Sequence, residues 1–317
     1  MKKFFLAALL AFPLLAEAQY PTKPVRGVVA FGTGGTTDVT ARIVAAAMSQ
    51  SLGQTVVIDN KPGADGIIAG SDVVKSAPDG YTIWFATYTQ ISALPSLRRN
   101  VPFDPIGDFT SVIWIGNIPL VLVIHPSIPA HSVKELVAVA RARPGMLVFA
   151  SGGVGSGGHL SGELFKYLTK TDILHVPYKG NSVALVDVLG GHVSMMFDTI
   201  TTSLPHVQRG KLRLLAVTTA ERSSLVPQTP TVAESGLPGF DTSAWYGTLG
   251  PARMPREFVE RLNAELNKAF NDPAFRDQFA VQGVRFIGGP PERLEQHMRS
   301  ELKRWGSVFA ATGIKPQ

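Results

Sequence analysis

Two glycine-rich segments of this chain have the residue types of an anion-binding site. The first runs from Phe31 to Asp38 and contains Gly34, Gly35 and Thr36, between a strand-like apolar run and a helix-like segment. Glycines allow a tight turn that exposes backbone N–H groups, and a following helix N-terminus adds partial positive charge. No lysine follows the glycines, so this is not a nucleotide P-loop. A small anion suits the segment, although a plain turn capped by its polar residues explains it too.

The second segment begins at Ser151, continues through Gly153-Val154-Gly155-Ser156-Gly157-Gly158 and leads into a helix at His159. Its glycines match G-x-G-x-x-G, the fingerprint of a dinucleotide site. That fingerprint also needs an acidic residue at the end of the next strand, whereas the next strand here ends at Tyr178-Lys179. The glycine pattern alone is weak evidence, so a dinucleotide site is disfavoured.

Known catalytic and metal-binding patterns are missing from the sequence. Ser156, His159 and Asp198 have the residue types of a hydrolase triad, but there is no G-x-S-x-G elbow and His159 is too close in chain to Ser156. The seven histidines show no H-E-x-x-H spacing, the acidic residues form no calcium loop, and there is no cysteine. We therefore expect no catalytic residue, no metal and no cofactor.

The N-terminus has the pattern of a secretory signal peptide. Lys2 and Lys3 precede an apolar run that ends in Ala16-Glu17-Ala18, an A-x-A cleavage site. The apolar run is shorter than the roughly twenty residues that span a bilayer. We expect residues 1–18 to be removed and the rest to be released, soluble, into the periplasm, since the site has no lipoprotein cysteine.

The net charge of +6 comes from scattered lysines and arginines, and the longest basic pair is Arg98-Arg99. Nucleic-acid binding needs clustered basic residues, so we expect no nucleic acid as partner. A mild positive charge suits an anionic small molecule, and an ordinary solvated surface explains it equally well.

The elements that must position these segments alternate between strand and helix, which is typical of an α/β fold with a largely parallel sheet. Glycine and proline turns separate them. We predict strands at Val25–Phe31, Thr55–Ile58, Tyr81–Ala86, Leu147–Ala150, Ile173–Pro177, Val193–Phe197 and Leu212–Val217, and helices at Asp38–Leu52, His159–Leu168, after Pro255 and at Pro291–Ala311. Val112 to Ile124 is interrupted by Gly116, Asn117 and Pro119, which predicts two buried strands joined by a turn.

The unit of strand, glycine turn and helix occurs twice, which predicts two lobes in a chain of 317 residues. We expect one crossing between Pro119 and Pro126 and a return near Ser243 to Gly250. The predicted first lobe is then residues 19–120 plus 242–317, and the second is residues 121–241. In open α/β sheets, ligands bind beyond the strand ends.

A series of short motifs resembles the Bug-type receptors of tripartite tricarboxylate transporters. The turn Gly34-Gly35-Thr36-Thr37-Asp38, followed by Ala41-Arg42, is similar to the G-G-x-x-D-x-x-A-R opening of that family. Further similar motifs, in the family's order, are Asn60–Ala64, Ala77–Thr82, Val101–Pro105, Gly155–Leu160, His175–Gly180, Leu189–Val193, Met196–Asp198 and Pro230–Glu234. The resemblance covers essentially the whole mature chain. One departure is Ala30 where the family usually has proline, which affects the pocket wall near Phe31.

The resemblance implies an α/β, two-lobed periplasmic binding protein of the type II, Venus-flytrap kind, with a ligand cleft between the lobes. Its partners would be a small organic carboxylate and integral membrane transporter subunits, and it would act as a monomer without turnover. Asp198 would orient water or loop N–H groups, because a carboxylate facing the ligand would repel it. The implied ligand-binding residues are Phe31, Gly34, Gly35, Thr36, Asp38, Thr87, Tyr88, Ser151, Gly155, Ser156, His159, Tyr178, Gly180, Asn181 and Asp198.

Two other functions remain compatible with the residues. One is a secreted carboxylate-processing enzyme, and the other is a ligand-responsive receptor that signals rather than transports. Backbone and water contacts leave almost no side-chain code for the ligand, so the sequence does not say which carboxylate is bound.

Overall fold

Strands and helices alternate along the chain in the computed structural model, which describes residues 20–280, 283–312, 314 and 316. The predicted signal peptide, residues 1–18, lies outside this range. The elements are β1 (Val25–Val29), α1 (Thr36–Leu52), β2 (Val56–Asn60), the 3-10 turn η1 (Ala64–Gly66), α2 (Ile67–Val74), β3 (Thr82–Thr87), the π-helical turn η2 (Thr89–Ala93), α3 (Leu94–Leu97), β4 (Phe109–Ile124), α4 (Val133–Ala142), β5 (Val148–Ser151), α5 (Gly157–Thr169), β6 (Leu174–Pro177), α6 (Asn181–Leu189), β7 (Met195–Thr199), α7 (Ile200–Gln208), β8 (Arg213–Val217), β9 (Ser243–Pro251), α8 (Arg256–Asn271), α9 (Pro273–Ala280), β10 (Arg285–Phe286) and α10 (Pro291–Thr312).

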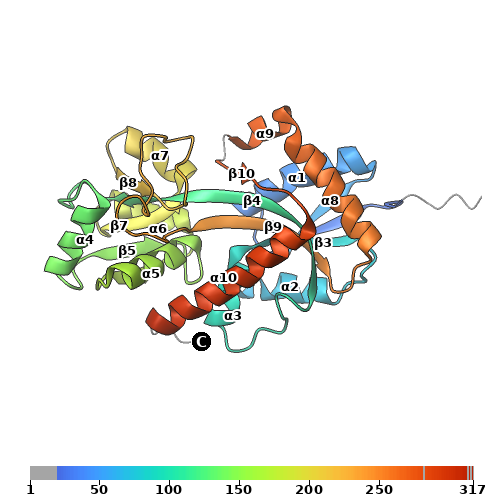
Figure 1. Cartoon of the computed structure of the whole chain (residues 1–317), viewed down its shortest axis with the longest axis horizontal. Coiled ribbons are helices and arrows are strands. Elements are labelled where there is room, and N and C mark those ends of the chain that lie inside the picture. The colour runs from blue at the N-terminus through green and yellow to red at the C-terminus, as the bar shows by residue number, and fades with distance from the viewer. Residues whose placement is uncertain (1–19, 281–282, 313, 315, 317) are drawn as a thin grey trace, which may run out of the picture.

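The strands form two halves of a sheet that share β4, and these halves are the centres of two lobes (Figure 1). In the first lobe the order is β2-β1-β3-β9-β4, with β1 parallel to β2 and β3, and β9 antiparallel to its neighbours. In the second lobe the order is β4-β7-β5-β6, with β5 parallel to β6 and β7, and with β8 also paired to β4. The α/β, two-lobed architecture predicted from the sequence is confirmed.

The long strand β4 corrects one prediction, because Val112 to Ile124 is part of one strand and not two strands joined by a turn. Gly116 lies so close to the backbone of β10 that a Cβ there would collide with the Arg285 carbonyl, which accounts for the glycine. Asn117 pairs with both β9 and β10. Pro119 is the last residue to pair with β9, and Leu120 is the first to pair with β7. Pairing with neighbouring strands therefore satisfies the backbone N–H and C=O groups of a segment whose residue types favour a turn.

The segment expected as the return crossing, Ser243 to Gly250, lies within β9 (Ser243–Pro251), which pairs with β3 and β4. The residue bounds of the two lobes remain a prediction.

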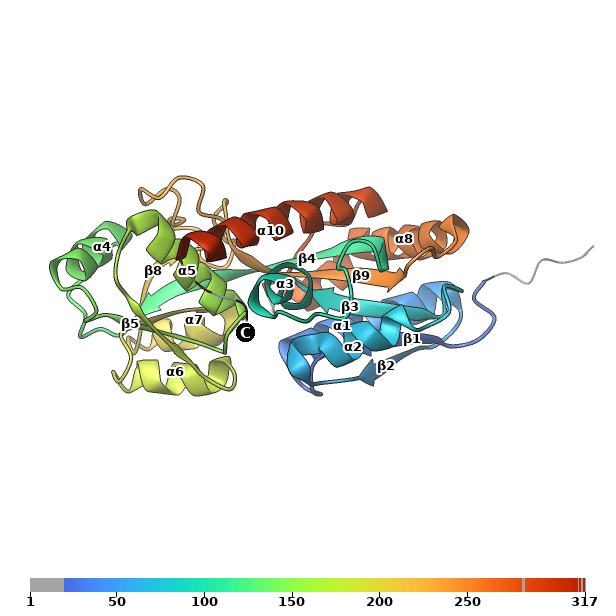
Figure 2. The same ribbon diagram turned by 90° about the horizontal axis from the view of Figure 1, so that it is seen from below.

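Helix α10 lies across both lobes (Figure 2). Leu294 and Met298, in its first half, are buried in the core that contains β3 and β9. Trp305 and Phe309, two turns further on, are buried in the core of the second lobe beneath β5, β7 and α5. Their spacing places them on one face of the helix, as the predicted amphipathic stripe requires.

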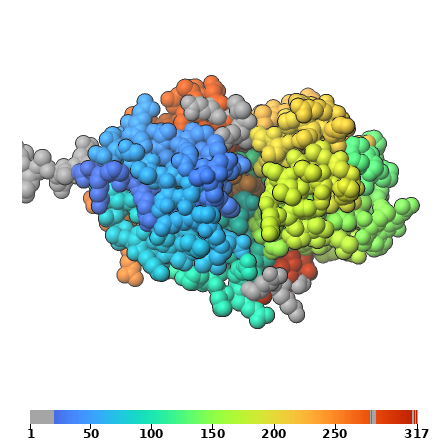
Figure 3. Space-filling model, turned by 180° about the vertical axis from the view of Figure 1, so that it is seen from behind, coloured from blue at the N-terminus to red at the C-terminus, as the bar shows by residue number. Residues whose placement is uncertain are grey.

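The face shown in Figure 3 is hollowed between the first lobe and the second lobe.

Within the described residues, no helix combines the length and the apolar character that crossing a membrane would require.

Candidate ligand-binding site

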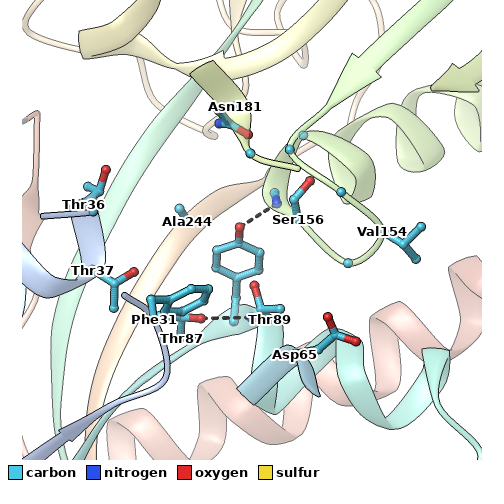
Figure 4. Close-up of a pocket in the computed structure, with 18 of the residues that line it drawn as sticks. Phe31, Thr36, Thr37, Asp65, Thr87, Thr89, Val154, Ser156, Asn181 and Ala244 are labelled. Carbon is cyan, nitrogen blue, oxygen red and sulfur yellow. Dashed lines mark hydrogen bonds between the residues drawn. The ribbon is translucent and has the colours of Figure 1, made fainter. Parts of the chain in front are cut away.

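A cavity of about 570 Å³ lies where the two lobes face each other. Its lining comes from the segments that follow β1, β2, β3, β5 and β6, from α3 and the last residue of β7, and from Leu120 of β4 with Ala244 and Tyr246 of β9. Figure 4 shows how several of these residues face one another. The segments that follow strands leave the carboxyl ends of those strands, where ligands of open α/β sheets bind. The volume is in the usual range for a small-molecule site.

Ten of the fifteen predicted ligand-binding residues line this cavity. They are Phe31, Gly35, Thr36, Thr87, Tyr88, Gly155, Ser156, Tyr178, Gly180 and Asn181. The other five lie outside the lining, namely Gly34, Asp38, Ser151, His159 and Asp198. They make hydrogen bonds to lining residues or to other residues behind the lining. Their direct contact with a ligand stays a prediction.

Asp38 holds the first glycine turn from behind. Its carboxylate, which is 2 % exposed, accepts hydrogen bonds from the Gly34 N–H at 2.9 Å, the Arg42 Nε at 3.0 Å and the Asn60 Nδ2 at 2.8 Å. The hydrogen bond from Arg42 is the main reason that the pKa of Asp38 falls to about 2, and the bonds from Gly34 and Asn60 act in the same direction. Asp38 is therefore ionised and occupied by protein donors.

The first turn presents free donors to the cavity. The backbone N–H groups of Gly35, Thr36 and Thr37 donate to no acceptor within the described part of the chain, and all three residues line the cavity. They begin α1, a helix of 17 residues, so its N-terminal partial positive charge lies at the same place. Fixed Asp38 and free N–H groups together suit this turn to an anion, as the sequence predicted, and its role in binding stays a prediction.

The donors of the second turn are largely used within the protein. The Gly155 N–H donates to Nδ1 of His159 at 3.1 Å, and the Gly157 N–H donates to the Tyr88 hydroxyl at 2.6 Å across the cleft. The Ser156 hydroxyl accepts from the His159 N–H and caps α5. The sequence predicted free N–H groups here, and it did not predict that Tyr88 and His159 would take them.

Two stacked histidines support the second turn. The rings of His159 and His175 lie 4.4 Å apart, and Nε2 of His175 is hydrogen-bonded to the Ser151 hydroxyl at 2.7 Å. Burial is the main cause that lowers the pKa of His159 to about 3 and of His175 to about 4. Both rings are thus neutral at neutral pH, which leaves Nδ1 of His159 able to accept the Gly155 N–H.

Asp198 positions Asn181 at the opposite wall. The Asp198 side chain is fully buried and accepts from Asn181 Nδ2 at 2.9 Å, Ser203 Oγ at 2.8 Å and Thr202 Oγ1 at 2.5 Å. Burial raises the pKa of Asp198, while the hydrogen bonds from Thr202 and Ser203 oppose that rise. Asp198 therefore supports the cavity wall through the amide of Asn181 rather than by lining the cavity itself.

The sequence analysis missed several lining residues, among them Asp65, Leu97, Arg98 and Tyr246. Arg98 belongs to the longest basic pair, and that pair was the one signal that pointed to it. Asp65 lies in a turn between two glycines, and its place at the cavity depends on tertiary contacts. Trp245 and Lys179 lie outside the lining.

The arrangement can bind an anion, and Ser156 and His159 lack the geometry of a nucleophile and its base. Ser156 and His159 do not form a Ser–His pair, because the His159 backbone bonds the Ser156 hydroxyl and its Nδ1 bonds Gly155. Among the described residues, no three side chains of His, Asp or Glu are grouped so that they could hold a metal ion.

A two-lobed α/β fold with a cleft lined by backbone N–H groups and hydroxyls defines a solute-binding protein. The chain belongs to the tripartite tricarboxylate transporter receptor family, whose model matches residues 40–314. This family is the one that the sequence motifs resemble.

Known relatives agree along nearly the whole chain. Protein BugT of Bordetella pertussis is 37 % identical over 313 residues, which are 98 % of this chain and 96 % of BugT. The structure of Rpa4515 from R. palustris with adipate is 38 % identical with a TM-score of 0.84, and covers 94 % of this chain and 100 % of that one. The structure of MatC from Rhodopseudomonas palustris with bound malate is 32 % identical with a TM-score of 0.78, and the match covers 91 % of this chain and 99 % of MatC.

Proposed function

We propose that this protein is a periplasmic receptor that captures a small organic carboxylate and delivers it to membrane subunits of a tripartite tricarboxylate-type transporter. The observation that carries the proposal is the first glycine turn, where the free N–H groups of Gly35, Thr36 and Thr37 meet the N-terminus of α1 inside the cavity. Family membership and the relatives solved with adipate and malate support it.

The cavity favours a carboxylate because its backbone donors are held in place at a helix N-terminus. An ionised acceptor strengthens each N–H hydrogen bond, and the helix N-terminus adds to that gain. Asp38 and Asp198 are both turned to protein donors, so neither presents its charge directly to the ligand. Binding by both lobes would stabilise the closed state, since the ligand contacts more groups there.

The proposal includes no turnover, a monomeric receptor and export with cleavage after Ala18. The Ser156 and His159 contacts described above support a binding role over a hydrolase. The signalling receptor remains an alternative, and a transporter gene encoded beside this one would favour transport. Intact-mass measurement of the periplasmic protein tests the export step, which fails if residues 1–18 are retained.

The experiment is a thermal-shift screen of mono-, di- and tricarboxylates, followed by calorimetry of each hit. A carboxylate at a hundred times its Kd should add about 2.7 kcal/mol to the free energy of unfolding. The matched control for each acid is its neutral amide, which should give no shift. Mass spectrometry should recover the acid unchanged. The proposal fails if no carboxylate shifts the transition, or if the amides bind as well as the acids, and a chemical product would favour the enzyme.

A further inference from the structure

An ion pair lies in the wall of the cavity. Of the lining residues, all within the described part of the chain, only Asp65 and Arg98 are charged. Nε and Nη2 of Arg98 donate to Oδ2 of Asp65 at 3.0 and 2.5 Å, and both side chains are a little over two-fifths exposed. Nη1 of Arg98 donates to no residue that the structure describes. The guanidinium therefore keeps free donors at the cavity wall.

The loop that carries Asp65 has an unusual backbone. Four successive residues, Gly63 to Gly66, have positive φ, including Ala64 at 47° and Asp65 at 55°. Such conformations are uncommon for residues with a Cβ and persist where the surroundings impose them. Gly66 packs on the buried side chain of Gln90, whose Oε1 accepts from the backbone and hydroxyl of Thr87. The buried Gln90 thus supports the turn that carries Asp65, and Asp65 accepts the hydrogen bonds of Arg98.

Arg98 lies next to the place where the lobes meet. It follows Leu97, the last residue of α3, and Leu97 packs against the second glycine turn, where a Cβ on Gly155 would lie 3.0 Å from Leu97 Cδ1. Asp65 is directed toward this side of the cavity, facing Val154 of the second turn (Figure 4). Arg98 and the first glycine turn thus line the same cavity from different segments of the chain.

We propose that Arg98, positioned by Asp65, binds the second carboxylate of a dicarboxylate whose first carboxylate occupies the first glycine turn. The inference rests on the proposed function and adds a substrate class to it. Asp65 leaves the Nη1 side of the guanidinium open. A ligand carboxylate there accepts hydrogen bonds from the guanidinium N–H groups in the plane of that group. Adipate and malate, found in similar structures, both carry two carboxylates and no ammonium group.

The test compares acids that differ only at the second carboxylate, namely adipate with hexanoate, succinate with butyrate, and malate with 2-hydroxybutyrate. Calorimetry is run on the wild type, Arg98→Met and Arg99→Met. Arg99 is the matched control, since it is the adjacent arginine, lies outside the lining and donates to the Pro316 carbonyl. We expect the wild type and Arg99→Met to prefer at least one dicarboxylate by roughly 10- to 100-fold over its partner. Arg98→Met should lose most of that preference and keep the monocarboxylate affinity.

The outcomes separate the two proposals. If the wild type binds none of the six acids and no acid in the wider screen, the proposed function fails and this inference with it. If the wild type binds acids but prefers the monocarboxylates, or if Arg98→Met keeps the full dicarboxylate preference, only the inference fails. It also fails if the wild type prefers aspartate to succinate and Asp65→Asn removes that preference, because Asp65 would then bind an ammonium group.

Discussion

Tyr88→Phe tests whether the cleft between the lobes is the binding site. The Tyr88 hydroxyl accepts from the Gly157 N–H at 2.6 Å, so it joins the loop after β3 to the second glycine turn. Burial raises the pKa of Tyr88, which keeps the phenol protonated at neutral pH. Its own proton is thus available to a ligand carboxylate while its oxygen accepts from Gly157.

The expected loss can be worked out from these two hydrogen bonds. A neutral hydrogen bond contributes about 0.5 to 1.5 kcal/mol, and one to a charged group about 1.5 to 3 kcal/mol. Losing both costs about 2 to 4.5 kcal/mol of binding free energy, which raises Kd roughly 30- to 2000-fold. The phenylalanine ring keeps the packing of Tyr88, so the fold should survive.

Calorimetry with adipate, or with the best acid from the screen, measures the change. The control is Tyr167→Phe, because Tyr167 is a half-buried tyrosine of α5 outside the cavity lining and should bind as wild type does. Unfolding in urea shows whether each variant is folded. A folded Tyr88→Phe protein with a Kd within threefold of the wild type would refute the role of Tyr88 in binding.

Three further predictions concern the residues behind the cavity. Asp198→Asn leaves at least one buried donor among Asn181, Thr202 and Ser203 unpaired, and should lower the free energy of unfolding by about 1 to 3 kcal/mol in urea titration and weaken binding; unchanged stability would contradict the contacts of Asp198. His159 and His175 are neutral when folded, with pKa values of about 3 and 4, and take up protons near 6.5 when unfolded. Stability should therefore fall as pH drops from about 6.5 toward 3, by up to about 1.4 kcal/mol per pH unit for each histidine, and less steeply in His159→Asn than in the exposed control His192→Asn; equal slopes would count against this. Gly155→Val places a β-branched residue at a φ of +82° against Leu97, so it should lower both the free energy of unfolding and the affinity for ligand. Ser156→Ala should cost only about 1 kcal/mol of stability, through loss of a helix cap. Calorimetry of both variants checks this, and a smaller loss in Gly155→Val than in Ser156→Ala would show that the turn tolerates a side chain.

The sequence predicted the alternation of strands and helices because buried apolar runs and turn residues are local signals. The helices at α1, α5 and α10 begin within two residues of their predicted starts. The prediction failed at β4, where Gly116, Asn117 and Pro119 favour a turn locally. Pairing with β9 and β10 outweighs that preference, and pairing between distant strands is not visible in a local pattern.

The family resemblance implied ten of the residues that line the cavity, and the loops that carry them follow strand ends. The rest depends on contacts between the lobes. No spacing in the sequence indicates that Tyr88 takes the Gly157 N–H, or that Asp65 meets Arg98 from 33 residues away. Asp38 and Asp198 were recognised as important residues, but only their buried hydrogen bonds show that they hold other groups in place.

The shared strand β4 also decides when the chain can fold. Its residues 109 to 124 pair with β7, β8, β9 and β10, all of which are made later, between residues 195 and 286. Helix α10, which completes both cores, comes later still. A chain that still lacks α10 therefore leaves these two cores incomplete, and pairings over such long sequence separations form slowly. Both lobes thus need C-terminal residues before all of their buried side chains are covered.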